Sequence, residues 1–347
     1  MCSFLGGSLA IKDYTQAVIN DSLFIVNTLI FLYKNDLKNC FAQERGGVIT
    51  LAEKSTLIMT NSTIINSYAF YGGVIYTQDF SVIYFIDCEI FGSRTSGTLI
   101  DLDHSILSMA NNKISKTFNN LFLITSSNVT ITGIIITDHE CNTIIQGCLL
   151  TSLSESQIQI SNATFLNIKS LTSDNIYLTS SLVSMNNIFI NDTINEKKEG
   201  CCIGSTNSEL NINGSVFENY LGNCLNIQFS VIRLNNTLFH SNQYDQNWFS
   251  LGAFYCLDCF IYIINRSIFS SNKHVVKGAA INCINTYKKN ENASLSKIIN
   301  SIFQENEGNE LGGAIYLQNQ QVEVESCDFL KNSANEGGGI YCSIDGK

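Results

Sequence analysis

The chain has 347 residues, with 30 acidic and 20 basic side chains and a formal net charge of −10. This balance argues against nucleic-acid binding, because proteins that bind nucleic acids need a basic surface to neutralise phosphates. A hydrophobic content of 45% with only 14% charged residues excludes an intrinsically disordered chain. We therefore expect a folded protein with a large core and no nucleic-acid partner.

The N-terminal part of the chain contains its most apolar stretch, residues 23–33. A membrane-spanning helix needs about 20 apolar residues, and this stretch has about half of that and is interrupted by Asn27. Residues 1–7 have neither the basic nor the apolar region of a signal peptide. We expect no transmembrane segment, and either a protein that stays in the cell or a segment of a longer chain.

The chain has no proline, so its turns must be built from glycine, asparagine, serine and aspartate. A glycine-led motif recurs along it, at residues 46–49, 72–76, 97–100, 252–255, 279–282, 312–316 and 338–341. Less distinct units begin near Asn120, Gln146, Asn175, Gly200 and Asn223. The period is about 26 residues, which indicates one supersecondary unit repeated about a dozen times.

Within the motif, the second position after the glycine pair is always apolar, as at Ile49, Ile75 and Leu99. Because strand side chains alternate between the two faces, we expect this position to point inward, the third outward and the fourth inward again. The third position is mostly amphipathic, as at Tyr255 and Tyr316. Asp101 is then a polar exception in the inward fourth position.

A second strand follows in each unit and closes on an apolar residue before a turn, as in the FxxN sequence from Phe303 to Asn306. Short strands stacked on their counterparts about 26 residues away describe a parallel β-helix. We predict an all-β, right-handed parallel β-helix of about 12 coils that forms a single domain over residues 1–347. The polar stretches 191–199 and 285–292 are expected to be surface loops inserted in longer coils.

The GGAI sequence at residues 312–315, with FxxN at 303–306 in the same coil, resembles the tandem repeats of the chlamydial polymorphic membrane proteins and related protist surface proteins. The resemblance covers residues 46–77 and 235–342. It implies a right-handed β-helix of the pectin-lyase-like class, displayed on a cell surface and associated with adhesion. No part of the chain resembles the C-terminal membrane barrel of the bacterial proteins.

Asparagine sequons are frequent, and they occur at Asn20, Asn61, Asn128, Asn162, Asn191, Asn213, Asn235, Asn265 and Asn292. Four of them (Asn61, Asn213, Asn235 and Asn265) lie four residues before the closing apolar residue of a second strand. This regularity predicts a ladder of stacked amides more than it predicts glycans, which would crowd one another on successive coils. Asn20, Asn191 and Asn292 are read as loop positions and are the candidate glycosylation sites.

The 13 cysteines leave at least one thiol unpaired within the chain. Cys256 and Cys283 occupy the same position in consecutive coils, so we predict that they are in contact and form a disulfide in an oxidising compartment. The CxxC sequence from Cys256 to Cys259 has no second pair or histidine pair nearby, so no metal site is predicted. Cysteines that fill inward positions of the coils, including Cys201 or Cys202, are the simpler interpretation.

An enzyme of this fold would need paired carboxylates, or calcium-binding aspartates with an arginine base. The candidate cluster is Asp101, Asp103 and His104, where the alternation of a strand places both aspartates on one face, with residues 138–140 further along. The adjacent aspartates, the NTD triplet and the Gly-His-Gly sequence of polygalacturonases are all missing. Catalysis is therefore not the favoured interpretation.

The sequence as a whole predicts a non-catalytic structural or adhesive module of an extracellular or cell-surface assembly, without a cofactor. Its expected partners are other proteins or copies of itself, with carbohydrate as a further candidate. The alternative function is a β-helix that binds or cleaves polysaccharides. A groove of carboxylates and basic residues would favour this alternative, whereas scattered Tyr, Asn and Ser would favour a structural module.

Overall fold

The computed structural model describes residues 3–5, 8–12, 23–25, 29–52, 54–142, 147–170, 174–195, 200–244, 252–274, 277–286 and 295–344. This part of the chain is all-β, with no helix, and so no helix that could span a membrane. It forms two compact units, residues 1–171 and 172–347. Each unit is a β-solenoid of parallel strands, and the turns, about 11 in the chain, recur about 26 residues apart. A single β-helix through both units stays a prediction.

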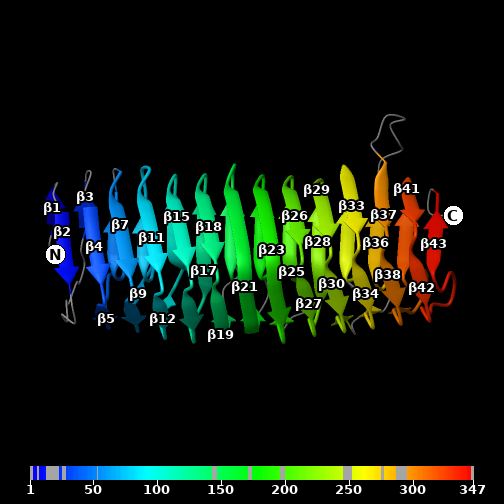
Figure 1. Ribbon diagram of the computed structural model, residues 1–347, viewed down its shortest axis with the longest axis horizontal. Coiled ribbons are helices and arrows are strands. Elements are labelled where there is room, and N and C mark those ends of the chain that lie inside the picture. Colours follow the sequence, from blue (N-terminus) through cyan, green and yellow to red (C-terminus); the bar gives the residue numbers. More distant parts are fainter. Residues whose placement is uncertain are drawn as a thin grey trace. The chain divides into compact units, whose positions relative to one another are not determined.

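The first unit stacks three strands of each turn on their counterparts in the next turn (Figure 1). The first series is β1 (Ser3–Leu5), β3 (Leu23–Ile25), β6 (Ile49–Leu51), β10 (Ile75–Thr77), β14 (Thr98–Asp103), β17 (Asn120–Thr125) and β20 (Leu150–Leu153). The second is β2 (Ser8–Lys12), β4 (Leu29–Tyr33), β7 (Thr56–Thr60), β11 (Val82–Ile86), β15 (Ile106–Ala110), β18 (Asn128–Thr132) and the first half of β21 (Gln157–Ser170). The third is β5 (Asp36–Lys38), β8 (Thr63–Ile65), β12 (Glu89–Phe91), β16 (Lys113–Ser115), β19 (Ile135–Cys141) and the second half of β21, and β9 (Tyr68–Ala69) pairs separately with β13 (Arg94–Thr95).

The second unit repeats this arrangement. Its first series is β22 (Ile176–Thr179), β25 (Cys201–Thr206), β28 (Asn223–Gln228), β32 (Phe254–Leu257), β36 (Ile281–Ile284), β40 (Ile315–Gln318) and β43 (Ile340–Ser343). The second is the first half of β23 (Leu182–Asn191), β26 (Glu209–Asn213), β29 (Val231–Asn235), β33 (Ile261–Asn265), β37 (Ser296–Ile299) and β41 (Val322–Glu325). The third is the second half of β23, β27 (Val216–Glu218), β30 (Leu238–His240), β34 (Ile268–Ser270), β38 (Ile302–Gln304) and β42 (Asp328–Leu330), with short strands β24 (Ile194–Asn195), β31 (Gln243–Tyr244), β35 (Lys273–His274) and β39 (Glu307–Gly308).

The core of each unit is made of inward side chains that stack on the same position of the next turn. In the first series Ile49 pairs with Ile75, and Ile75 with Ile100, and all three are fully buried. The predicted alignment placed Leu99 in this column and was therefore wrong by one residue at this turn. With the shift corrected, Asp101 lies in the column of Tyr76, which is the third position and not the inward fourth.

The third position was expected to face solvent, and this expectation was wrong for most turns. Tyr255, Asn282 and Tyr316 are 8%, 3% and 2% exposed. At Tyr316 a cation from the preceding turn covers the ring, since the Nζ of Lys277 lies 4.9 Å from its centroid. Strand alternation sets the direction of a side chain, but neighbouring long side chains decide whether water reaches it.

The corners of the turns explain how the chain folds without proline. Many corners use one residue in the left-handed region, most often Asn, Asp or Ser, followed by an inward polar residue. At one of them Asn111 has a φ of 55°. The next residue, Asn112, accepts a hydrogen bond from the Cys88 N–H at 2.9 Å and donates to the Phe85 carbonyl at 3.0 Å. Asn tolerates the left-handed region, and its amide replaces the backbone bonds that a bend removes.

The two predicted loop insertions have different outcomes. In the first, Asn191 ends β23 and Ile194–Asn195 form β24, so the expectation of one surface loop over 191–199 was wrong for its first half. Residues 196–199 lie outside the described residues. In the second, Asn285 and Thr286 follow β36, while 287–292 are not described. The register pairs Ile281 with Ile315, so this turn is longer than the mean, and its extra residues fall between β36 and β37.

Candidate functional site

Asp101 lies in the middle of β14 and is 7% exposed. The hydroxyl of Thr98 donates to its Oδ2 atom at 3.2 Å. Burial raises the pKa of Asp101 to about 6, and the negative charge of Asp103 adds to this rise, while the Thr98 hydrogen bond and the Arg45 charge oppose it. The dominant cause is desolvation, which disfavours the ionised carboxylate.

Asp103 and His104 form an exposed pair at the end of the same strand. Oδ1 of Asp103 lies 2.7 Å from Nδ1 of His104, and their side chains are 43% and 52% exposed. His104 is a corner residue with a φ of 45°, and the ring of Phe80 approaches its imidazole edge-on at 6.0 Å. Ser105 follows as the inward polar residue of this corner. Asp103 and His104 thus stand where the other turns place structural corner residues.

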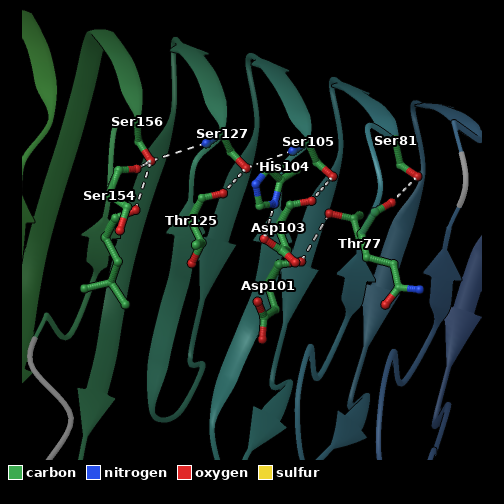
Figure 2. A network of polar contacts seen from close by, with 12 residues as sticks. Thr77, Ser81, Asp101, Asp103, His104, Ser105, Thr125, Ser127, Ser154 and Ser156 are labelled. Atoms are coloured by element: carbon green, nitrogen blue, oxygen red, sulfur yellow. Dashed lines mark hydrogen bonds and ion pairs between the residues drawn. The ribbon is translucent and has the colours of Figure 1, made fainter.

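A series of serines connects this corner to the next turns (Figure 2). The backbone N–H of Ser105 donates to the Ser127 hydroxyl at 2.9 Å, and the N–H of Ser127 donates to the Ser156 hydroxyl at 3.3 Å. The Ser105 hydroxyl donates in turn to the Asp103 carbonyl at 2.7 Å. These bonds hold the backbone of the corner and leave the Asp103 carboxylate to His104.

The structure therefore brings Asp101, Asp103 and His104 together along β14 and the corner that follows it, with Asp101 buried and the other two exposed. The further residues of the prediction, 138–140, lie in β19 of the third series. Asp138 is another corner residue there, with a φ of 52°, and accepts a hydrogen bond from Asn167 at 3.1 Å.

The cysteine prediction was right in register and wrong in bonding. Cys256 and Cys283 are direct partners of β32 and β36, as expected. Cys256 is nevertheless bonded to Cys259, and Cys283 is a free buried thiol. Parallel stacking brings equivalent side chains together, but the corner after β32 lets Cys259 turn back onto Cys256.

The predicted amide ladder is confirmed for three of its four members. Nδ2 of Asn235 donates to Oδ1 of Asn213 at 2.8 Å, and Nδ2 of Asn265 donates to Oδ1 of Asn235 at 3.0 Å. Asn61 does not share this column, because it is a corner residue with a φ of 48° and follows Thr60, the last residue of β7. The predicted position of Asn61 is therefore wrong by one residue.

The candidate glycosylation sites are tested in part. Asn191 is the last residue of β23 and not a loop residue, and its Oδ1 accepts a hydrogen bond from Nδ2 of Asn219 at 3.1 Å. Asn20 and Asn292 lie outside the described residues. Glycosylation at the two latter positions stays a prediction.

Sequence reasoning missed one buried cluster of side chains in the first unit. His139, Cys141 and Cys148 offer ligand atoms that all lie within 4.8 Å of one another. Cys141 and Cys148 form a disulfide with a Cα–Cα distance of 5.6 Å. Burial lowers the pKa of His139 to about 4, and hydrogen bonds from its surroundings oppose this only in part. The available signal was a histidine and a cysteine at alternate strand positions, with a second cysteine seven residues later.

A cleft of about 570 Å³ lies at a corner of the first unit, and it is lined by Asn66, Ser67, Tyr68, Phe91, Gly92, Arg94, Lys116 and Phe118. Its two cations lie over aromatic rings, with Arg94 4.6 Å from the Phe118 centroid and Lys116 5.5 Å from the Phe91 centroid. Among the described residues neither cation has an ion-pair partner, whereas the neighbouring Lys113 is paired with Glu89 at 3.4 Å.

Comparison with known proteins agrees with the repeat architecture. Residues 326–343 match the family described as the Chlamydia polymorphic membrane protein (Chlamydia_PMP) repeat, which confirms the expected resemblance for this part of the chain. No curated protein matches the chain in sequence. Each unit is thus a parallel β-helix of repeated turns, and residues 326–343 are similar to the polymorphic membrane protein repeat.

Several solved structures are similar at low identity. The catalytic domain of a GH87 α-1,3-glucanase is 10% identical with a TM-score of 0.32, and the match covers 91% of this chain and 63% of that one. A periplasmic alginate epimerase is 8% identical with a TM-score of 0.31, over 89% of this chain and 76% of that one. The A-module of a mannuronan C-5 epimerase from Azotobacter vinelandii is 8% identical with a TM-score of 0.28, over 97% and 86%. The chain spans less than two thirds of the glucanase domain.

Proposed function

We propose that this chain is a non-catalytic structural or adhesive β-helix module of an extracellular or cell-surface assembly. The observation that carries the proposal is that repeated side chains contact their own equivalents in the next turn: amides form hydrogen bonds and aromatic rings stack. In the second unit Asn242, Asn272, Asn306 and Asn332 form one such ladder, and their amides bond to one another at 2.9 to 3.0 Å. These repeated residues thus stabilise a regular solenoid.

An exposed aromatic patch in the first unit supports the adhesive part of this proposal. Phe41, Phe70 and Tyr71 are 55%, 46% and 46% exposed. Phe41 stacks on Tyr68 with ring centroids 5.7 Å apart, and Phe70 meets Tyr71 edge-on at 4.7 Å. Clustered exposed aromatic residues are typical of interaction surfaces.

The test is the adhesion of beads coated with the full chain to a panel of cell surfaces. We expect adhesion, a large loss of it in the Phe41→Ser/Phe70→Ser variant, and little change in Phe80→Ser, a matched control because Phe80 is 64% exposed at a different corner. We expect no product from polygalacturonate or alginate. Turnover of either polymer that Asp101→Asn abolishes would contradict the non-catalytic proposal.

The cleft lined by Arg94 and Lys116 favours acidic polysaccharide binding as a second candidate function. Aromatic side chains pack against sugar rings, and two cations with no ion-pair partner within the described part of the chain suit the carboxylate of a uronic acid. Titration calorimetry with uronic acid oligosaccharides tests this. We expect Arg94→Ala and Lys116→Ala to weaken binding and the ion-paired Lys113→Ala to leave it unchanged; equal loss in all three would mean that general charge attraction is responsible.

A further inference from the structure

The cluster of His139, Cys141 and Cys148 occupies a special place in the repeat. His139 lies three residues after Ile136, the inward apolar residue of β19. The same place after the third strand is taken by Thr117 in the preceding turn and by Asn242 in the second unit, so it is the inward polar position of a corner. In this turn a histidine fills it, and two cysteine sulfurs lie beside it. All three side chains are at most 1% exposed.

The imidazole is oriented by a hydroxyl on one side and faces sulfur on the other. Nδ1 of His139 lies 2.7 Å from the Thr117 hydroxyl, and Nε2 lies 3.4 Å from Sγ of Cys141. The other neighbour of Nε2 is the Cys148 carbonyl, also at 3.4 Å. A disulfide sulfur has no proton to donate and is a weak acceptor, and the contact of Nε2 with the Cys148 carbonyl is long for an N–H···O hydrogen bond.

The same three side chains also offer the ligand types and the spacing of a metal site. Histidine ligands commonly bond through their second ring nitrogen to a fixed oxygen, as His139 does to Thr117. Zinc binds nitrogen at about 2.0 Å and thiolate sulfur at about 2.3 Å, which places tetrahedral ligand atoms about 3.5 Å apart. Nε2 and Sγ of Cys141 are already at this separation.

We propose that His139, Cys141 and Cys148 bind one Zn²⁺ ion when both cysteines are reduced, and that their disulfide excludes the ion. Two thiolates neutralise a divalent cation, so the filled site carries no net charge and avoids most of the cost of a buried ion. A monovalent ion would leave a buried negative charge. Three protein ligands leave the fourth coordination position open, as in other sites with two cysteines and one histidine.

Reduction of the disulfide makes both cysteine ligands available to the ion. A dithiol reductant supplies two electrons and two protons to the Cys141–Cys148 disulfide, which becomes two thiols while the reductant becomes a cyclic disulfide. Zn²⁺ then displaces the two thiol protons as it binds. Reoxidation by a disulfide oxidant transfers the two electrons from the thiolates to that oxidant, which takes up two protons and becomes two thiols, while the Cys141–Cys148 bond re-forms and the ion is released.

Titration of the full chain with Co²⁺ as a spectroscopic probe tests the proposal. In protein reduced with a phosphine and handled without oxygen, we expect thiolate-to-cobalt charge-transfer absorption that saturates at one equivalent and is removed by Zn²⁺. The oxidised protein should give no such absorption. We expect Cys141→Ser/Cys148→Ser to abolish it and Thr117→Val to weaken affinity roughly tenfold, because the hydroxyl positions His139.

Matched variants keep the test decisive. His139→Asn places at this corner the residue used at Asn242, so it should fold normally, as circular dichroism can check, and lose the ion. Cys256→Ser/Cys259→Ser removes the other disulfide, which has no such histidine cluster among the described residues, and should bind one equivalent unchanged. Binding that survives His139→Asn, or that disappears with Cys256 and Cys259, would overturn the proposal.

Discussion

Asn272 donates its side-chain amide to Oδ1 of Asn306 at 2.9 Å, although the two residues are 34 positions apart in the chain. The same amide also donates to the Phe239 carbonyl at 3.1 Å, and the backbone N–H of Asn272 donates to the same Oδ1 of Asn306 at 3.2 Å. Phe239 stacks on Phe269 with ring centroids 4.7 Å apart. The FxxN sequence is thus a pair of ladders, one of amides and one of rings, that continues from turn to turn.

Replacing a buried member of the amide ladder should be costly. We expect Asn272→Ala to lower the free energy of unfolding by about 2–3 kcal/mol, because the carbonyl of Phe239 and Oδ1 of Asn306 lose a buried donor. Denaturant unfolding measures the change. The exposed amide ladder provides the control, and Asn235→Ala should cost less than about 1 kcal/mol; equal losses at both positions would contradict the role of burial.

The second glycine of the GGAI sequence, Gly313, should be required for stability because the next turn leaves no room for a side chain there. A Cβ atom at Gly313 would lie 2.3 Å from the Gly338 carbonyl oxygen and 2.5 Å from that of Ser333, both in the next turn. Backbone atoms cannot yield easily, so we expect Gly313→Ala to destabilise the chain by more than about 2 kcal/mol. At Gly339 the nearest atom is 3.8 Å from such a Cβ. Gly339→Ala should therefore be close to neutral, and thermal unfolding of both variants checks the contrast.

The buried carboxyl of Asp101 should oppose folding at neutral pH. Its pKa is raised to about 6 in the folded chain from 3.8, so the folded state holds a proton that the unfolded state has released between these values. Its contribution to stability is present at low pH and is lost as the pH rises through about 6. We expect Asp101→Asn to stabilise the protein at pH 7 by about 1–3 kcal/mol and to change little at pH 4. A stability difference that is the same at both pH values would contradict this assignment.

The buried side chain of His274 should make the protein less stable as the pH falls, which is the opposite of the effect of Asp101. Burial lowers its pKa to about 3 from 6.5, so the unfolded state takes up a proton first as the pH falls. The stability that the neutral side chain provides is then lost below pH 6.5 and down to about pH 3. At pH 5 the loss is roughly 2 kcal/mol. We expect the difference between the wild-type chain and His274→Gln to shrink on acidification, and unfolding in urea at pH 8 and pH 5 measures it; an unchanged difference would rule out this role of His274.

The sequence by itself determined the repeat, because stacking demands the same kind of residue at the same place in every turn. The period of about 26 residues and the FxxN positions could be read directly, and with them the parallel strands of each unit. The amide ladder of Asn213, Asn235 and Asn265 was predictable for the same reason. In a regular solenoid, equivalent residues recur in the sequence at the length of one turn.

The tertiary structure alone decided the exact register, the burial of individual polar groups and the pairing of cysteines. A one-residue shift at Ile100 moved Asp101 to another column, and the motif around it was too degenerate to show the shift. Cys256 pairs with Cys259 because a corner reverses the chain there, which strand alternation does not describe. His139 meets Cys148 only after the chain has passed from β19 to β20, so their proximity depends on how that corner closes in space.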